Sequence, residues 1–265
     1  MRMIEQDQRY AAQDAPNPEE MDALYAATFE RADERQKELE DRFIVISGGR
    51  LTFRRAEMLH LNPSWVDPVN KMIEIPAHDE CSCPYCVAQA QEYAENNDTT
   101  VEEALQHYWS PKTRASNRHV YYGWSEQTID AVERFALEVG SLDMAPKTIN
   151  NRLDALAEYA GIERNLYPHA LRAASAMFFA DLGIEAYYLQ ALMGWTDLDV
   201  AVSYLQASGV QIARRLNRAF AVAGFERPDP VPEEDLLPTS TEQPTTPGFD
   251  PVPPSVATLD EFAES

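Results

Sequence analysis

Four side chains in the C-terminal half of the chain have the chemistry needed to act together on a phosphodiester. His169 and Arg172 are three positions apart, and Tyr204 follows Trp195 by nine positions. A guanidinium donates two parallel hydrogen bonds to a phosphate, and an indole ring contributes one N–H donor. A phenol can serve as a nucleophile. We therefore interpret this block as a candidate site for phosphoryl transfer on DNA.

The same side chains also have structural interpretations. Tyr204 shares an apolar helical face with Val200 and Ala201, as a core tyrosine would. Trp195 follows a glycine and, taken alone, is typical of a packing residue. Arg172 is harder to explain in this way, because it lies in an otherwise apolar helix and a buried arginine needs a partner.

Two upstream segments carry further basic side chains. Segment 52–61 reads T-F-R-R-A-E-M-L-H-L and contains Arg54, Arg55 and Glu57. Segment 111–120 reads P-K-T-R-A-S-N-R-H-V and contains Lys112, Arg114 and Arg118.

Taken in this order, the segments resemble the signature of the tyrosine recombinases, also called the phage integrase family. That family carries G-[LM]-R-x-x-E-x-x-x-L, then K-T-x-x-x-x-R, then H-x-x-R with a G-[HW] pair and a tyrosine nine residues later. The resemblance extends from about Asn17 to Gly224. Thr52 stands where the family has glycine, which leaves Arg55 as a rival to Arg54 for the first arginine.

The resemblance implies an α+β fold, mainly helical, with a small antiparallel sheet that carries the lysine hairpin. It implies a site-specific recombinase or integrase that cuts and rejoins DNA through a 3′-phosphotyrosine, without ATP or a catalytic metal. The implied catalytic residues are Arg54, Lys112, His169, Arg172, Trp195 and Tyr204, with Glu57 in support and Arg55, Arg114 and Arg118 on DNA. A phenol has a reference pKa of about 10, so the cationic cluster should favour its ionised form.

Two other functions remain open. Segment 184–204 is typical of a helix–turn–helix with Gly194 in the turn, which favours a non-catalytic DNA-binding regulator. Nicking and relaxation of DNA in the manner of type IB topoisomerases would use similar chemistry. A regulator has no evident need for Arg54, Lys112 and Tyr204, whereas plasmid relaxation without a specific site would indicate the topoisomerase-like activity.

Several helices, a short strand and strand-like segments on both sides of the Lys112 loop must position these residues. Asn17 should cap a helix with Pro18 at its first position and Glu20 completing a capping box. Residues 71–75 alternate like a short strand. Further helices are expected at 125–137, 148–159, 169–182, 186–193, 199–207 and 210–223, with glycines at 161, 183 and 224 as helix ends.

A hydrophilic insertion at 78–103 contains a candidate metal site. His78, Cys81, Cys83 and Cys86 lie within nine residues, and one imidazole with three thiolates suits tetrahedral zinc in a structural role. The alternative is a loop with free thiols. All three cysteines lie close together and cannot form a disulfide framework, which fits a reducing cytoplasm.

The segments outside the catalytic domain have a different character. Residues 1–16 are expected to be flexible, residues 17–227 to form the catalytic domain, and the acidic, proline-rich tail 228–265 to be disordered. Few residues precede the expected domain, so a separate DNA-clamping domain is expected to be missing and an accessory DNA-binding protein to replace it. The expected partners are duplex DNA and further copies of the chain, as a tetramer on DNA, with no membrane.

The net charge of the chain has the opposite sign from that expected of a DNA-binding protein. The sequence has 44 acids against 22 bases, a formal net charge of −22, with 18 arginines and only 4 lysines. An acid-rich, lysine-poor composition is what we expect from a salt-saturated, halophilic cytoplasm, where screening limits repulsion to about 3 Å. The alternative is an acidic protein that never contacts nucleic acid.

This interpretation predicts a strong dependence of folding on salt. Repulsion among the acids should loosen the chain at about 0.1 M KCl, where the Debye length is about 10 Å, and the chain should fold at about 2 M KCl. Removal of residues 228–265 deletes nine acids and no base, so it should lower the salt required. Calorimetry checks both expectations, and one melting temperature at both salt concentrations would contradict them.

Overall fold

The computed structural model describes residues 11–205, 216 and 221–224. Residues 1–215 form one compact unit and residues 216–265 a second, and the account below concerns the first. Its first half contains α2 (Pro18–Glu30), α3 (Arg35–Gly49), α4 (Arg55–Leu59), η1 (Pro63–Trp65), β1 (Val66–Asp67), β2 (Met72–Ile75), α5 (Pro84–Asn97) and α6 (Val101–Leu105). Its second half contains η2 (Arg114–Ser116), β3 (Arg118–Tyr121), α7 (Glu126–Arg134), the π-helical turn η3 (Phe135–Val139), α8 (Pro146–Tyr159), α9 (Pro168–Leu182), α10 (Ala186–Met193) and α11 (Leu198–Tyr204).

The start of α2 confirms the expected capping box. The Asn17 side chain accepts a hydrogen bond from the Glu20 amide at 2.9 Å, and the Glu20 carboxylate accepts one from the Asn17 amide at 2.8 Å. These two bonds satisfy amides that the helix itself leaves without partners. The sequence therefore fixes where the first described helix begins.

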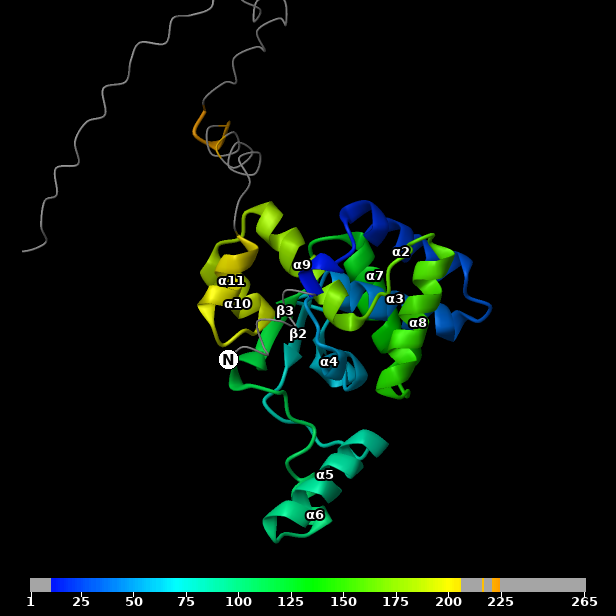
Figure 1. Ribbon diagram of the computed structural model, residues 1–265, viewed down its shortest axis with the longest axis vertical. Coiled ribbons are helices and arrows are strands. Elements are labelled where there is room, and N and C mark those ends of the chain that lie inside the picture. Colours follow the sequence, from blue (N-terminus) through cyan, green and yellow to red (C-terminus); the bar gives the residue numbers. More distant parts are fainter. Residues whose placement is uncertain (1–10, 206–215, 217–220, 225–265) are drawn as a thin grey trace, which may run out of the picture. The chain divides into compact units, whose positions relative to one another are not determined.

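Helix α3 lies at the centre of the core, although the sequence analysis did not predict it. It packs against α2, α7 and α9 (Figure 1). Phe43 is fully buried and stacks on Phe135 with ring centroids 4.1 Å apart. The helix also buries charge, because Asp41 lies 2.8 Å from Arg152 Nε and Arg42 pairs with Asp130. These paired charges hide the apolar periodicity that marks a core helix in a sequence.

The sheet is small and antiparallel, in the order β1-β2-β3. Ile73 pairs with Val120 and Ile75 with Arg118. The first two side chains are buried, so one face of the sheet joins the core. Helices α5 and α6 lie between β2 and β3 in the sequence, where a hydrophilic insertion was expected. The predicted architecture, mainly helical with a small antiparallel sheet, is confirmed.

Helices α9 and α10 end where the sequence predicted, whereas α11 was expected to continue to residue 207 and ends at Tyr204. Gly183 follows α9 with φ of 93° and Gly194 follows α10 with φ of 62°, both in the left-handed region that glycine favours. Helices α10 and α11 contact each other and α9, and α10 also contacts β3 (Figure 1). The helix expected at 210–223 and the tail at 228–265 fall largely or wholly outside the described residues. No helix in the described part of the chain is long and apolar enough to span a membrane.

Candidate functional site

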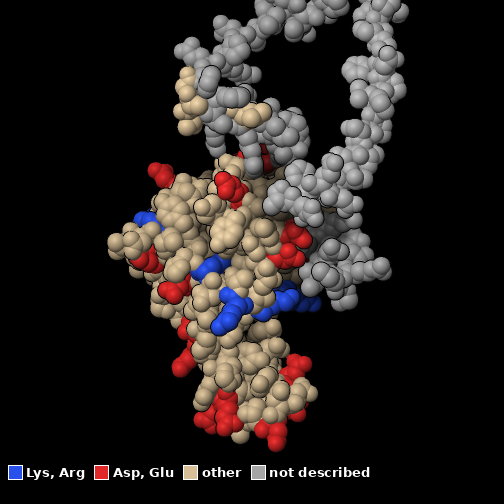
Figure 2. All heavy atoms as spheres, turned by 90° about the vertical axis from the view of Figure 1, so that its left-hand side faces the viewer, with Lys and Arg blue, Asp and Glu red and all other residues tan. Residues whose placement is uncertain are grey.

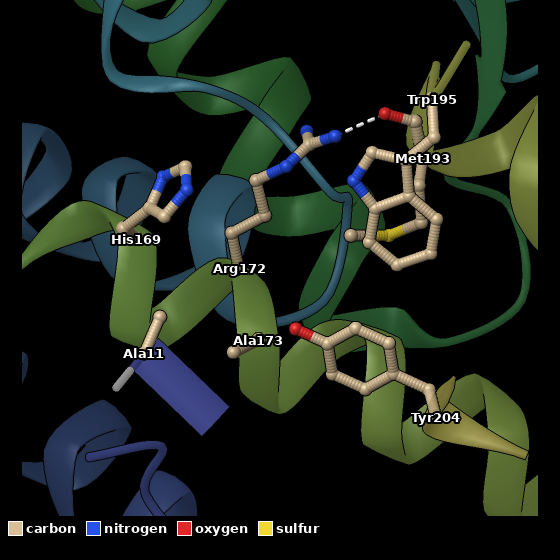
Figure 3. A pocket seen from close by; sticks show the side chains of 7 residues that line it. All are labelled: Ala11, His169, Arg172, Ala173, Met193, Trp195 and Tyr204. Carbon is tan, nitrogen blue, oxygen red and sulfur yellow. Dashed lines mark hydrogen bonds between the residues drawn. The ribbon is translucent and has the colours of Figure 1, made fainter. Parts of the chain in front are cut away.

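One pocket collects four of the six candidate catalytic side chains. His169, Arg172, Trp195 and Tyr204 line it together with Ala11, Ala173 and Met193. Helix α9 contributes the first two, the α10–α11 turn contributes Trp195, and the end of α11 contributes Tyr204. Figure 3 shows the Tyr204 hydroxyl and the Trp195 indole nitrogen pointing toward the side of the pocket that Arg172 occupies. The block that the sequence singled out is therefore also a cluster in space.

The pocket is closed around Arg172. Its volume is about 20 Å³, which is room for roughly one water molecule. Arg172 is 3% exposed, and its guanidinium donates one hydrogen bond to the carbonyl oxygen of Thr52. A second goes to the carbonyl oxygen of Met193 (Figure 3). Burial holds the pKa of Arg172 well below its usual value, and the nearby charges of Arg54 and Arg118 lower it further. In this state the guanidinium is bound to backbone rather than open to a ligand.

Glu57 provides the negative charge that this group of arginines requires. Its carboxylate is 1% exposed and accepts hydrogen bonds from Arg54 Nη1 at 2.9 Å and from Arg118 Nη1 and Nη2 at 2.9 Å each. Burial alone would raise the pKa of Glu57, but the charges of Arg118, Arg172 and Arg54 outweigh it and lower the pKa to about 2. Glu57 is therefore ionised across the ordinary pH range. Its bonds to Arg118 also join α4 to β3.

The structure favours Arg54 over Arg55 as the first arginine of the site. Arg54 caps α4, and its guanidinium donates to Ser116 Oγ at 2.7 Å and to the Gly194 carbonyl at 2.7 Å. Burial lowers its pKa, and the neighbouring Glu57 partly offsets this shift. Arg55, by contrast, is exposed. Arg54 thus connects α4, the η2 loop and the α10–α11 turn.

Arg118 corrects one prediction from the sequence. It was expected to contact DNA, but it is 7% exposed and its guanidinium is bound to groups inside the protein. Besides Glu57, it donates to the carbonyl oxygens of Leu192 at 2.8 Å and Thr52 at 3.0 Å. Its position in β3 turns the side chain toward the core, where it has a structural role. Its alternation with Val120 in β3 is the local signal that could have separated this arginine from the exposed Arg114.

Thr52 shows why the family pattern has glycine at this position. Its φ is 65°, in the left-handed region where a β-branched side chain is strained. Its hydroxyl donates to the Leu192 carbonyl at 3.0 Å, which helps to hold this conformation. The same turn aims the Thr52 carbonyl at Arg118 and Arg172. Threonine therefore preserves the backbone shape that the site needs.

Tyr204 and Trp195 form a stacked pair. Their ring centroids are 5.2 Å apart, with 17° between the ring planes. Burial raises the pKa of Tyr204, and the charge of Arg172 offsets only part of that shift. The expectation that the cationic cluster lowers this pKa is therefore wrong for the closed state. The reason is that Tyr204 is largely buried, and burial disfavours the charged phenolate more than the charge of Arg172 favours it.

Lys112 lies outside the pocket, in the exposed loop that precedes η2. Its neighbour Thr113 contacts Ser116, with the two hydroxyl oxygens 2.9 Å apart, and Ser116 in turn accepts from Arg54. A Cβ on Gly194 would lie 2.8 Å from the Ala115 carbonyl oxygen, so the η2 loop packs directly on the α10–α11 turn. These contacts hold the Lys112 loop beside the site.

Three exposed basic side chains lie on segments that adjoin the site. Arg55, Lys112 and Arg114 are all exposed, and they come from the α4 and η2 segments that Arg54 ties together. Figure 2 shows Lys and Arg side chains grouped on the face that carries α10, α11 and β3, with Asp and Glu around them. The chain therefore has a basic area next to the pocket, although its net charge is negative.

The candidate metal ligands also require a correction. The structure places His60 with Cys81, Cys83 and Cys86, with one ligand atom from each lying within 4.8 Å of the others. The fourth residue expected from the sequence, His78, instead has Nδ1 3.1 Å from the Trp109 carbonyl oxygen. His60 precedes the cysteines by more than twenty residues, so a search for a compact sequence motif cannot find it.

The Glu57 network predicts a specific pH dependence of stability. Because the pKa of Glu57 falls from 4.5 to about 2 on folding, its contribution is fully present above pH 4.5 and is lost as the pH falls toward 2. Glu57→Gln should lower the free energy of unfolding by about 3–5 kcal/mol at neutral pH, since it leaves buried arginines without their counter-charge. The difference from wild type should shrink on acidification.

Urea unfolding of both proteins in high salt, at neutral pH and at pH values below 4.5, measures this difference. The exposed Glu74, which pairs only loosely with His119, provides the control variant Glu74→Gln. Equal stability of the Glu57→Gln and Glu74→Gln proteins at neutral pH would contradict the role given to Glu57.

The sequence and the fold were compared with those of known proteins. No family model and no curated protein matches the sequence. Among solved structures, XerA recombinase matches with a TM-score of 0.51 and 16% identity, over 77% of this chain and 62% of that one. The Tn1549 transposon integrase in complex with transposon right end DNA matches with a TM-score of 0.53 and 16% identity, over 78% of this chain and 66% of that one.

The same integrase in complex with circular intermediate DNA gives a TM-score of 0.53 at 17% identity, over 77% of this chain and 66% of that one. The chain thus spans less than two thirds of the length of these solved chains. At 16–17% identity, the similarity to these solved structures shows the fold alone. The described part of the chain has the fold of tyrosine recombinase catalytic domains.

Proposed function

We propose that this chain is a tyrosine-type, site-specific recombinase that cuts and rejoins duplex DNA through a phosphotyrosine at Tyr204. The observation that carries the proposal is the pocket in which His169, Arg172, Trp195 and Tyr204 meet. These side chains come from three separate elements, and their types match the needs of phosphoryl transfer. The likeness in fold to XerA recombinase and to the Tn1549 integrase supports the same conclusion.

The proposed reaction exchanges one phosphodiester for another. The Tyr204 oxygen forms a bond to phosphorus while the bond to the 5′ oxygen breaks. The phenol proton passes to the imidazole of His169, and Lys112 donates a proton to the leaving 5′ oxygen. Arg54 and Arg172 stabilise the charge on the non-bridging oxygens, and Trp195 adds an N–H donor. Attack by a 5′ hydroxyl on the phosphotyrosine reverses these steps and rejoins the strand.

DNA binding must open the pocket for this reaction. Arg172 is bound to two carbonyl oxygens, and the space beside it is far too small for a phosphodiester. A phosphate supplies two charged acceptors in place of the carbonyl groups, and charge-assisted bonds are stronger than neutral ones. The phosphate charge also favours the protonated guanidinium. We infer that the closed pocket is the DNA-free state of the enzyme.

The basic face beside the pocket is the proposed DNA surface. Arg55, Lys112 and Arg114 are exposed there, and basic side chains neutralise the phosphate backbone without regard to sequence. The Tn1549 integrase was solved with transposon right end DNA and with circular intermediate DNA, which supports a DNA substrate for this chain too. We also propose that the chain acts as a tetramer, together with an accessory DNA-binding protein. Its biological role would be integration or excision of a mobile element.

The closed pocket also favours one alternative function. A raised pKa at Tyr204 and a buried Arg172 are what a non-catalytic DNA-binding protein on the same scaffold would tolerate. The regulator and the recombinase differ in one property, which is formation of a covalent bond to DNA. Relaxation of supercoiled plasmids without a specific site would instead indicate a topoisomerase-like activity.

We expect Tyr204→Phe to bind DNA like the wild type but to form no covalent adduct on nicked suicide substrates, because only the nucleophilic oxygen is removed. Gel electrophoresis under denaturing conditions detects the adduct, and a shift assay measures binding. Tyr187 is 69% exposed and lies in α10, so Tyr187→Phe is a matched control that should keep full activity. Undiminished adduct from Tyr204→Phe would assign the nucleophile to another residue.

The two adjacent arginines of α4 should differ in their effect. Arg54→Ala removes bonds to Glu57, Ser116 and Gly194, whereas Arg55→Ala removes only an exposed charge. Loss of one transition-state donor costs about 100-fold to 1000-fold in rate. We expect a loss of this size for Arg54→Ala and a smaller, salt-dependent loss of DNA affinity for Arg55→Ala. Single-turnover cleavage rates check the ranking, and the reverse order would show that Arg55 is the catalytic arginine.

A further inference from the structure

A cluster of thiols and one imidazole joins the insertion to the helix that follows Arg54. The cluster consists of His60, at the end of α4, and Cys81, Cys83 and Cys86, at the start of α5. All three cysteines are free thiols, and Cys86 is fully buried. We propose that these four residues bind one Zn²⁺, which holds the insertion against α4.

The distances fit tetrahedral zinc. His60 Nε2 lies 3.2 Å from Cys86 Sγ and 3.5 Å from Cys83 Sγ. Zinc bonds of about 2.0 Å to nitrogen and 2.3 Å to sulfur, at tetrahedral angles, separate such atoms by about 3.5 Å. The four ligand atoms all lie within 4.8 Å of one another, so small side-chain movements would complete the coordination shell. Three cysteines and one histidine are one of the usual ligand sets of structural zinc.

The surroundings of His60 prepare its Nε2 atom for a metal. The opposite ring nitrogen, Nδ1, lies 2.7 Å from the Ala56 carbonyl oxygen, one turn back in α4. A proton on Nδ1 that is donated to this carbonyl leaves the lone pair of Nε2 facing the sulfur atoms. Histidine ligands of metals usually have such a second hydrogen bond, because it fixes the tautomer and the ring orientation. The ring also stacks on Trp109, with centroids 5.2 Å apart.

Backbone amides donate hydrogen bonds to two of the sulfur atoms and so prepare them for metal binding. The Cys83 amide donates to Cys81 Sγ and the Cys86 amide donates to Cys83 Sγ, each at 3.4 Å. Bonds of this kind stabilise the negative charge of thiolates, and the metal binds thiolates rather than thiols. The chain between Cys81 and Cys86 is therefore folded around its sulfur atoms.

The metal would act on the candidate site through α4. This helix has only five residues, with Arg54 and Glu57 at its N-terminal end and His60 as its C-terminal cap. A bond at His60 fixes one end of α4 while the Glu57 network fixes the other. The effect on cleavage rests on the proposed function, whereas binding of zinc does not.

The test uses the full-length chain, with metal content measured by mass spectrometry after extensive dialysis. Wild type should hold about one zinc per chain, and His60→Ala should lose most of it. His78→Ala is the matched control, because the sequence alone favours His78, and this variant should keep its zinc. His60→Cys supplies a fourth thiolate, so it should restore binding if His60→Ala merely fails to fold. Replacement of zinc by Co²⁺ should give the absorption bands of a tetrahedral thiolate site.

Metal-free wild type with three reactive thiols, or loss of zinc from His78→Ala instead of His60→Ala, would overturn the proposed site. A metal other than zinc would overturn its assignment. Cleavage and DNA affinity are then compared in the two His60 variants. Slower cleavage at unchanged DNA affinity in His60→Ala, with recovery in His60→Cys, supports the link through α4. Unchanged cleavage in zinc-free protein would overturn that link while leaving the metal site intact.

Discussion

The candidate site depends on one buried carboxylate. Glu57 pairs directly with Arg54 and Arg118 and lowers the electrostatic cost of the buried Arg172. Three guanidinium groups this close together repel one another, and burial of unpaired charge is costly. The carboxylate offsets both effects and holds together α4, β3 and α9, which are far apart in the sequence. Every other feature of the site is arranged around this group of four charges.

Backbone carbonyl groups complete the network and explain two unusual positions. Thr52 adopts a left-handed conformation that directs its carbonyl to two of the arginines, and Gly194 allows the η2 loop to pack on the turn before Trp195. The carbonyl oxygens of Thr52 and Met193 hold Arg172 in the absence of an anion. They are therefore the groups that a bound phosphate would replace, which links the folded network to the proposed chemistry.

The sequence predicted the parts of the molecule that depend on local signals. The cap at Asn17, the glycine after α9 and the block from His169 to Tyr204 all follow from residues close together in the chain. Helix α3 was not predicted, because its buried charges pair with partners on α7 and α8 that only the fold brings near. The grouping of His60, rather than His78, with the cysteines could not be predicted for a related reason, since His60 comes from another element.

Electrostatic roles were the hardest to predict. Arg114 and Arg118 have the same charge and lie four residues apart, yet one is exposed and the other lies in the Glu57 network. The pKa of Tyr204 is raised because the effect of burial outweighs the favourable charge of Arg172, whose guanidinium is bound to backbone carbonyl groups. Such properties follow from burial and hydrogen-bond partners, which no residue pattern contains.

Identification of the amino acid that attaches to DNA tests the central claim most directly. The full-length chain is incubated in high salt with a nicked duplex, the adduct is digested with protease and nuclease, and the modified peptide is sequenced by mass spectrometry. The account predicts a nucleotide on the oxygen of Tyr204 and on no other residue. Attachment to a different residue would contradict the proposed pocket chemistry, and specific DNA binding without any adduct would show that the fold serves as a binding protein.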